Sequence, residues 1–406
     1  MVKVLRSIVV GPLEPYIVGF AEDLLRQGYS RTSGEQHVCF IAHLDRWLIS
    51  EGVGLDGLSE PVIERYLIER RAAGYVEYRS WKALRPVLDY LAPLGVLPVP
   101  DAVAPSPVEL VLAQYSAYLV GERGLTSSTA CGYVYCVRPF VASRVRGDVV
   151  DLAGISTVEV TGFVLAACPG RAVGSAKLIV CALRSFLRWL HLSGQVPGSL
   201  ADAVPSVAGW KLSTLPKALE PDQLRRLLAS CDRRTPSGRR DYAVVLLMSR
   251  LGLRAGEVAC LCLDDIDWRR GQIVVVGKAG RAERLPLPAD VGAAIAAYLR
   301  RGRPVTAQGR SVFVRVHAPR RALTAGGVTM VVSDSGQRAG LGKIHAHRLR
   351  HTAATAMLRA GSPLPEIGQV LRHRSPLTTA IYAKVDREAL AVLARPWPVA
   401  FEGGRS

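Results

Sequence analysis

The first half of the chain contains an internal repeat, and this repeat limits the folds that the chain can adopt. Residues 83–91 (ALRPVLDYL) match residues 182–190 (ALRSFLRWL). Because glycine and proline specify backbone geometry, their recurrence at matched places favours two copies of one module over a chance similarity of apolar spacing. The matched pairs are Gly28 with Gly124, Gly95 with Gly194, and Pro98 with Pro197.

Each copy is expected to be a compact bundle of helices. In the first copy, apolar residues such as Phe40, Leu44 and Leu48 recur at helical spacing. We expect one module over residues 1–100 and its second copy over residues 107–198, joined by a stretch rich in Pro, Ala and Val. The helices predicted in the first copy cover residues 16–26, 32–50, 59–73 and 80–91.

Beyond residue 220 the pattern is different. Residues 272–276 (QIVVV) are β-branched and flanked by glycines, and predict a strand that pairs with residues 282–287 across a turn at 277–280. Helices are predicted over residues 221–230, 238–251 and 254–261. The sequence therefore predicts a linker at 199–219, a mainly helical domain with a small antiparallel sheet at 220–396, and a tail at 397–406.

The charge of the chain indicates a polyanionic partner. Its 52 Lys and Arg exceed its 34 Asp and Glu by 18, and nucleic acid is the first candidate for such an excess. The sequence has no apolar run of about 18 residues and no N-terminal signal peptide, so we expect no membrane contact and a cytoplasmic location. The eight cysteines lie among apolar neighbours, and we expect them to be reduced and buried.

The stretch from His347 to Tyr382 carries the most distinctive chemistry. His347 and Arg350 stand three positions apart, so on a helix they share one face and direct two donors at one point. The alternative is a metal hydrolase, because His345, His347 and His351 are spaced so that they could ligate one zinc ion. That set lacks a carboxylate, however, and the interleaved arginines repel a cation. We therefore expect no metal, and we interpret His345 and His351 as packing or supporting residues.

Six residues together resemble the active site of the tyrosine recombinases, the phage integrase family. The motifs that carry the resemblance are HRLRH at 347–351, LRH at 371–373 and TTAIY at 378–382. The resemblance covers roughly residues 109–390 and implies tandem helical SAM-like DNA-binding domains followed by an α+β catalytic domain. The catalytic residues that it implies are Arg254, Lys278, His347, Arg350, His373 and Tyr382, with Glu257 orienting the cations.

The resemblance implies DNA strand exchange without metal, ATP or any other cofactor. Tyr382 attacks a scissile phosphate to give a 3′-phosphotyrosyl link and a free 5′-hydroxyl, and Lys278 protonates the leaving oxygen. These roles agree with the chemistry of the side chains. A tyrosine of pKa about 10 needs help to attack at neutral pH, and the forked donors of Arg254 and Arg350 stabilise the charge that develops on the phosphate.

The chain departs from the family pattern before the second histidine, where the family usually has glycine. Arg372 stands at that position and Arg374 lies just beyond. Either the turn differs or these arginines add phosphate contacts, and we favour added contacts. Lys211 and Lys217 in the linker are further candidate DNA contacts, although a solvated connector fits them equally well.

Two other functions use parts of the same pattern. A type IB topoisomerase-like enzyme would relax DNA by the same chemistry. A catalytically silent protein would have the same fold and bind DNA without cleaving it. The expected partners are duplex recombination sites, other copies of the chain in a dimer or tetramer, and companion recombinases or accessory proteins, in a bacterial cytoplasm at the nucleoid. The first module contacts flanking DNA or another protomer, and the apolar tail around 389–397 docks on a neighbouring subunit.

Overall fold

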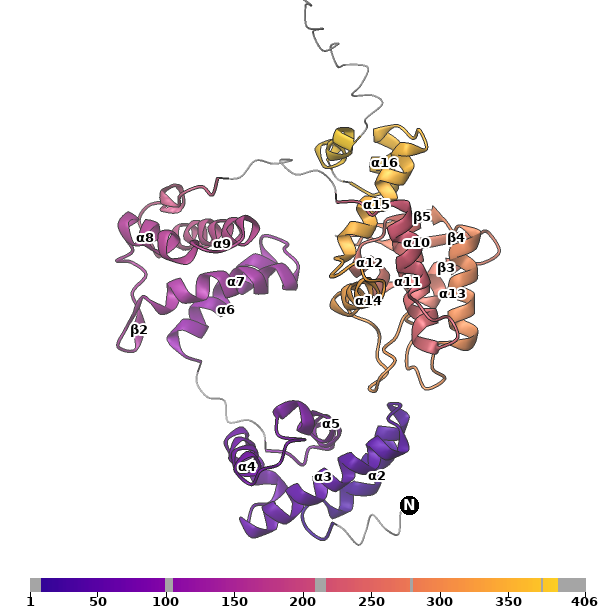
Figure 1. Cartoon of the computed structure of the whole chain (residues 1–406). Coiled ribbons are helices and arrows are strands. Elements are labelled where there is room, and N and C mark those ends of the chain that lie inside the picture. Colours follow the sequence, from indigo (N-terminus) through magenta and orange to yellow (C-terminus); the bar gives the residue numbers. More distant parts are fainter. Residues whose placement is uncertain (1–8, 99–104, 209–216, 278–279, 374, 386–406) are drawn as a thin grey trace, which may run out of the picture. The chain divides into compact units, whose positions relative to one another are not determined.

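The computed structural model describes residues 9–98, 105–208, 217–277, 280–373 and 375–385. The predicted class, mainly helical with a small antiparallel sheet, is confirmed (Figure 1). By compactness the chain divides into residues 99–213 and the remainder. Buried apolar residues gather into three large clusters, one in each helical module and one between residues 219 and 349.

The first module contains four helices close to those predicted. Ser30 caps the second of them, since its side chain accepts a hydrogen bond from the backbone N–H of Ser33. Phe40, Leu44 and Leu48 are buried, as the helical spacing predicts. The helices are α2 (Ile17–Arg26), α3 (Arg31–Ser50), α4 (Glu60–Ala72) and α5 (Trp81–Leu91), with short 3-10 turns at Glu14–Tyr16, Leu55–Gly57 and Ala92–Leu94.

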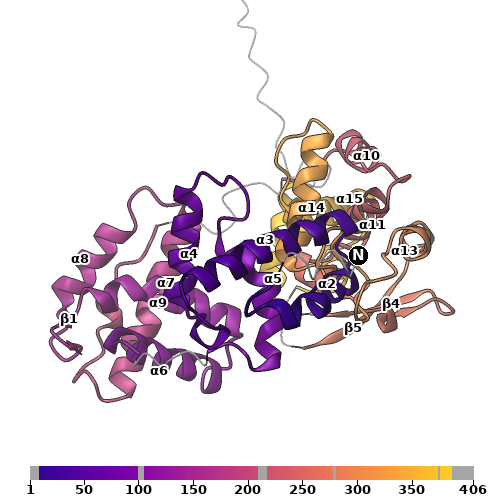
Figure 2. The same ribbon diagram turned by 90° about the horizontal axis from the view of Figure 1, so that it is seen from below.

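The second module has the same order of four helices, with a short hairpin added. Thr126 caps its second helix as Ser30 does in the first module, and the matched glycines Gly28 and Gly124 both have positive φ. Figure 2 shows the hairpin at one end of the module. The elements are α6 (Pro107–Gly121), α7 (Ser127–Ala142), β1 (Val145–Arg146), β2 (Val149–Val150), α8 (Thr157–Ala167), α9 (Val173–Leu192) and the 3-10 turn Ala201–Ala203.

The C-terminal domain is built around a central helix, α11 (Pro236–Leu251), which packs against α13, α14 and α15. Ten of its side chains are buried, from Gly238 to Leu251, so it is apolar on almost every side and belongs in a core. The surrounding helices are α10 (Pro221–Ala229), α12 (Ala255–Cys260), α13 (Ala289–Arg301), α14 (Ala325–Arg338) and α15 (Ala346–Arg359).

A three-stranded antiparallel sheet lies beside these helices in the order β3–β4–β5 (Figure 1). The strands are β3 (Ile266–Asp267), β4 (Gln272–Val276) and β5 (Ala282–Pro286), with a 3-10 turn at Leu263–Asp265 before β3. The predicted hairpin of β4 and β5 is confirmed, and Ile273 pairs with Leu285. The two-residue strand β3 was not predicted, because a segment that short shows no alternation.

The last described elements place the tyrosine. Helix α16 (Leu364–Val370) is followed by α17 (Pro376–Thr379) and by the 3-10 helix η6 (Ala380–Val385). A fourth, smaller apolar cluster joins these elements to α15, and it consists of Ala354, Ile367, Leu371 and Tyr382. Because Tyr382 is a member of that cluster and only 1% exposed, packing holds its ring in place.

The expected burial of the cysteines is wrong for most of them. All eight are free, as expected, but Cys231 alone is buried, while Cys39, Cys131, Cys181 and Cys260 are exposed. Consecutive helical residues are about 100° apart around the axis, so Cys39 points to solvent although Val38 and Phe40 on either side of it are buried. Apolar neighbours in sequence therefore do not fix the face on which a helical residue lies.

Within the described ranges, no helix has the length and apolar character needed to span a bilayer. The predicted tail contacts at 389–397 lie outside the described residues.

We predict that Gly252→Ala destabilises the contact between α11 and α16. Gly252 ends α11 with φ of 61°, and a Cβ there would lie 2.4 Å from Cδ2 of Leu371. The left-handed conformation alone costs alanine roughly 1–2 kcal/mol, and the clash adds to that cost. Amide hydrogen exchange of peptides 246–262 and 364–373 measures the local stability that is lost.

Gly271→Ala is the matched control, because Gly271 also has φ of 61° but nothing lies within 4 Å of its added Cβ. It isolates the backbone cost. Equal effects of the two substitutions would mean that the packing of Leu371 against Gly252 is unimportant.

Candidate active site

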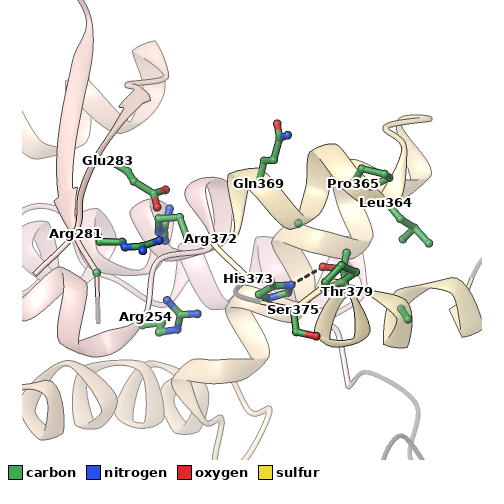
Figure 3. Close-up of a pocket in the computed structure, with 14 residues that line it drawn as sticks. Arg254, Arg281, Glu283, Leu364, Pro365, Gln369, Arg372, His373, Ser375 and Thr379 are labelled. Carbon is green, nitrogen blue, oxygen red and sulfur yellow. Dashed lines mark hydrogen bonds between the residues drawn. The ribbon is translucent and has the colours of Figure 1, made fainter. Parts of the chain in front are cut away.

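An open cleft of about 1300 Å³ lies between the β4–β5 hairpin and helices α16 and α17. Arg254, Arg372 and His373 line the cleft, and so do Arg281 and Glu283 from the hairpin itself (Figure 3). A surface with several arginines and a histidine suits a phosphate group. The described part of the chain shows no group of three His, Cys, Asp or Glu side chains that would hold a metal ion.

Arg350 is the most deeply buried charge beside this cleft. Its side chain lies on α15, is 1% exposed, and donates from Nη1 to the carbonyl of Gly252 at 2.7 Å and from Nη2 to the carbonyl of Leu371. Burial, followed by the charge of Arg254, lowers the pKa of Arg350 to about 10, so it stays protonated at neutral pH. A guanidinium has five N–H donors, and those not bonded to these two carbonyls remain for an anion.

Glu257 joins two of the arginines. Its carboxylate accepts a hydrogen bond from the backbone N–H of Arg254 at 2.8 Å and another from Nη1 of the same residue at 2.6 Å. Nη2 of Arg372 donates to Oε2 of Glu257 at 2.7 Å, the same oxygen that accepts from the backbone N–H of Arg254. Burial alone would raise the pKa of Glu257, but the hydrogen bonds from Arg254 and the charge of Arg372 lower it overall. The carboxylate is therefore ionised and fixes the direction of both guanidinium groups.

Arg372 keeps the backbone conformation that glycine usually supplies at this turn. Its φ is 55°, which is the left-handed region that glycine adopts without strain. That side chain is 5% exposed and pairs with Glu257, which is 4% exposed. In this structure Arg372 makes a buried ion pair with Glu257 and also lines the cleft, and its contact with a phosphate stays a prediction. Its Nε is buried without a hydrogen-bond partner.

The two histidines that the resemblance implies have different neighbours: the ring of His347 lies 4.4 Å from that of His351, and the ring of His373 lies 6.4 Å from that of Tyr382. His347 is exposed at the start of α15, and desolvation with the charges of Arg350 and Arg254 lowers its pKa. Burial and the same arginines lower the pKa of His373 to about 4. Nδ1 of His373 lies 2.7 Å from the hydroxyl of Thr379, drawn as a dashed line in Figure 3. His373 is consequently neutral at pH 7 and held in one orientation.

The hydroxyl of Tyr382 contacts His351 rather than His347. Its oxygen lies 2.9 Å from Nδ1 of His351, and the ring of His373 lies parallel to the tyrosine ring at 6.4 Å. Burial raises the pKa of Tyr382, while Arg350 opposes that rise. The tyrosine is therefore protonated at rest, and its contact with His351 agrees with the expectation of a supporting residue rather than with that of a packing residue.

Some of the expected site residues lie outside the described residues: Lys278, Lys211 and Arg374. Lys217 is described, and its side chain is exposed. The carbonyl of Lys217 accepts a hydrogen bond from Nε of Arg348 at 3.0 Å, which ties the end of the linker to α15. Arg254, His347, Arg350, His373 and Tyr382, by contrast, are described and lie near one another. The charges of Arg254 and Arg350 lower the pKa of His347 and of His373, and the ring of His373 lies 6.4 Å from that of Tyr382.

Two residues contact the implied catalytic groups in ways that the sequence did not predict: Thr379 was not singled out, and His351 was expected only to pack or to support. Thr379 bonds to His373, and His351 bonds to Tyr382. Thr379 lies inside the TTAIY motif and His351 ends the HRLRH motif. Their membership of these motifs is the sequence feature that could have indicated that they lie near the site. Their partners could not be inferred, because each contact depends on how α17 and η6 fold back onto α15.

Comparison with known proteins agrees with this geometry. The family model described as the phage integrase family matches residues 217–389. The putative integrase/recombinase y4rA of Sinorhizobium fredii is 42% identical over 393 residues, covering 96% of this chain and 95% of that protein.

Two solved structures share the fold. One is the XerH site-specific recombinase bound to palindromic difH substrate in a post-cleavage complex, with a TM-score of 0.56 and 20% identity over 82% of this chain and 94% of that chain. The other is a lambda integrase tetramer bound to a Holliday junction, with a TM-score of 0.53 and 16% identity over 75% of this chain and 87% of that chain.

The fold and the cluster of basic and tyrosine side chains define a class of DNA breaking and rejoining enzymes. The chain belongs to the phage integrase family, the tyrosine recombinases, which carry out site-specific DNA strand exchange.

We predict that Arg372→Ala lowers the free energy of unfolding of the C-terminal domain by about 3–5 kcal/mol, because it breaks a buried ion pair. Arg372→Gly loses the same pair but relieves the left-handed backbone, and it should recover roughly 1 kcal/mol of that loss. Urea unfolding of the two variants and the wild type measures both terms. An Arg372→Ala variant as stable as the wild type would show that the pair with Glu257 contributes nothing.

Proposed function

We propose that this recombinase exchanges DNA strands through a covalent 3′-phosphotyrosyl intermediate in which Tyr382 is the nucleophile. The observation that carries the proposal is that Tyr382 is fixed in a small core while its ring lies parallel to that of His373, a residue that lines the basic cleft, at 6.4 Å. A phosphate bound in that cleft would contact Arg254 and His373, and Tyr382 lies next to that histidine.

The donor set suits a five-coordinate phosphate. Arg254 lines the cleft, and Glu257 fixes the direction of its guanidinium. The buried guanidinium of Arg350 has N–H donors beyond those bonded to the carbonyls of Gly252 and Leu371. Positive charge fixed in advance at this point stabilises the transition state more than the ground state, because negative charge grows on the nonbridging oxygens. We assign Lys278 as the acid for the 5′ leaving oxygen by its place in the motif order.

Strand exchange fits this chain better than DNA relaxation or silent binding. The relatives that match over most of its length are named integrases and recombinases, and a reactive tyrosine with its cationic neighbours is present. We propose that duplex recombination sites are the substrate and that protomers assemble on them, as in the DNA-bound lambda integrase tetramer. The reaction then takes place at DNA in the bacterial cytoplasm, at the nucleoid, with no metal or nucleotide cofactor.

The direct test is trapping of the intermediate on DNA. A duplex selected by the protein from a random-sequence library, and nicked beside the mapped cleavage position, lets the short cleaved strand diffuse away and the covalent adduct accumulate. The wild type should give a band that survives denaturing electrophoresis. Tyr382→Phe should lose the adduct completely while binding the duplex with unchanged affinity. Loss of binding together with the adduct, or an adduct that persists in the variant, would contradict the assignment.

The first module differs in charge from the C-terminal domain. Residues 1–98 contain 11 Lys and Arg and 12 Asp and Glu, whereas residues 220–406 contain 31 and 15. Several arginines of the first module are also paired, as Arg71 is with Glu64 and Arg65 with Glu51. A module without excess positive charge has little electrostatic affinity for a phosphate backbone. We propose that it binds another protomer or an accessory protein.

We predict that removing residues 1–98 leaves the length of the DNA footprint unchanged but reduces assembly of more than one protomer on a site, measured by native gel shift and mass photometry. The doubly substituted full-length chain with Arg26→Ala and Arg31→Ala is the control, since both side chains are exposed and should be dispensable for DNA binding. A footprint that shortens in either variant would show that the module contacts DNA.

A further inference from the structure

The contact between Tyr382 and His351 has a chemical consequence. Nδ1 of His351 lies 2.9 Å from the tyrosine oxygen, which is hydrogen-bond distance to the atom that would attack phosphorus. A base for the tyrosine proton must lie within that reach. His347, one helical turn earlier on α15, has its ring 4.4 Å from the ring of His351, but the contact with the hydroxyl belongs to His351.

Packing holds this pair in place from several sides. His351 lies on α15, which packs against η6 and α16, and its neighbours Arg350 and Thr352 are both buried. Tyr382 is 1% exposed within the cluster of Ala354, Ile367 and Leu371. Core contacts therefore fix the ring of Tyr382, while the partly buried ring of His351 lies between the rings of His347, at 4.4 Å, and Tyr382, at 5.6 Å.

Both partners are uncharged in the free protein. Burial, then the nearby His347 and Arg350, lowers the pKa of His351 to about 4. Burial raises the pKa of Tyr382. At pH 7 the hydroxyl of Tyr382 thus keeps its proton. With the imidazole proton of His351 on Nε2, Nδ1 is free to accept the hydrogen bond from that hydroxyl.

We propose that His351 is the catalytic base that takes the proton of Tyr382 through Nδ1 during DNA cleavage. This inference rests on the proposed function. As the bond between Oη of Tyr382 and phosphorus forms, the phenolic proton moves to Nδ1, and the bond between phosphorus and O5′ breaks. The leaving oxygen takes a separate proton from the acid assigned to Lys278. On rejoining, a 5′-hydroxyl attacks, and protonated His351 returns its proton to the departing tyrosine oxygen.

The charges around the pair favour proton transfer only when DNA is bound. The groups that face it are His347 and Arg350 on α15 and His373 next to η6, and Arg254 at the start of α12 acts on His373. In the free protein the positive charges disfavour a protonated His351. A bound phosphate offsets those charges, so the imidazole becomes a better base when substrate is present. Its low basicity without substrate keeps the tyrosine protonated until then.

The test uses the full-length protein and its selected, nicked duplex, with sulfur replacing the bridging 5′ oxygen at the scissile phosphate. A sulfur leaving group needs no proton donor, so the rate of adduct formation reports on the nucleophile alone. His351→Asn places an amide oxygen near the position of Nδ1 and accepts the hydrogen bond without taking the proton. His351→Phe keeps the packing of a ring. His345→Asn is the control, because His345 is exposed on the same helix.

We expect His351→Asn and His351→Phe to bind DNA normally and to form the adduct roughly 100- to 10,000-fold more slowly. Their rates should rise about tenfold per pH unit between pH 7 and 9, because an unassisted tyrosine must first ionise and its ordinary pKa is about 10. The wild type and His345→Asn should show no such rise. Variant rates within threefold of the wild type with the same pH profile would overturn the proposal.

Nitrogen NMR of the ¹⁵N-histidine-labelled protein without DNA tests the same hydrogen bond independently. We expect His351 to carry its proton on Nε2, and Tyr382→Phe to shift the Nδ1 resonance. A proton on Nδ1 would overturn the proposal even if the wild type cleaves DNA. If the wild type forms no adduct while the NMR result is as expected, the proposed function fails and the proton path from Tyr382 fails with it.

Discussion

The buried guanidinium of Arg350 is the interaction on which the active-site region depends. It joins three segments that are far apart in the sequence, because one side bonds to the end of α11 at Gly252 and the other to the end of α16 at Leu371. A fully buried charge is costly unless it is well bonded, so these carbonyls must stay where they are. The same contacts bring the tyrosine core, with Leu371 in it, against the central helix of the domain.

Concentrating several cations around one cleft creates repulsion that the protein offsets in two ways. Glu257 supplies a buried negative charge shared by Arg254 and Arg372. The histidines contribute no positive charge at neutral pH, since the pKa values of His351 and His373 are both lowered to about 4. Arg372 adds a second ion pair to the buried carboxylate of Glu257, but its own backbone has to adopt the left-handed conformation. A bound DNA phosphate would supply the remaining counter-charge.

The sequence was informative where structure is local. The strand at 272–276 and the helices of the first module were predicted within a few residues, since β-branched runs and apolar spacing are read over short windows. The candidate catalytic set came from a family resemblance, and no spacing argument would have joined Arg254 to residues almost 100 positions later. The partners of Arg372 and His351 could not be predicted, because each depends on tertiary packing. Glu257 lies 115 positions from Arg372.

The most direct test of this account is to locate the atom of the protein that becomes attached to DNA. The trapped adduct can be digested with protease and nuclease, and the peptide that retains a nucleotide identified by mass spectrometry. The account predicts one modified peptide, with a 3′-phosphonucleotide on Tyr382. A nucleotide on any other residue, or one attached through its 5′-phosphate, would contradict it.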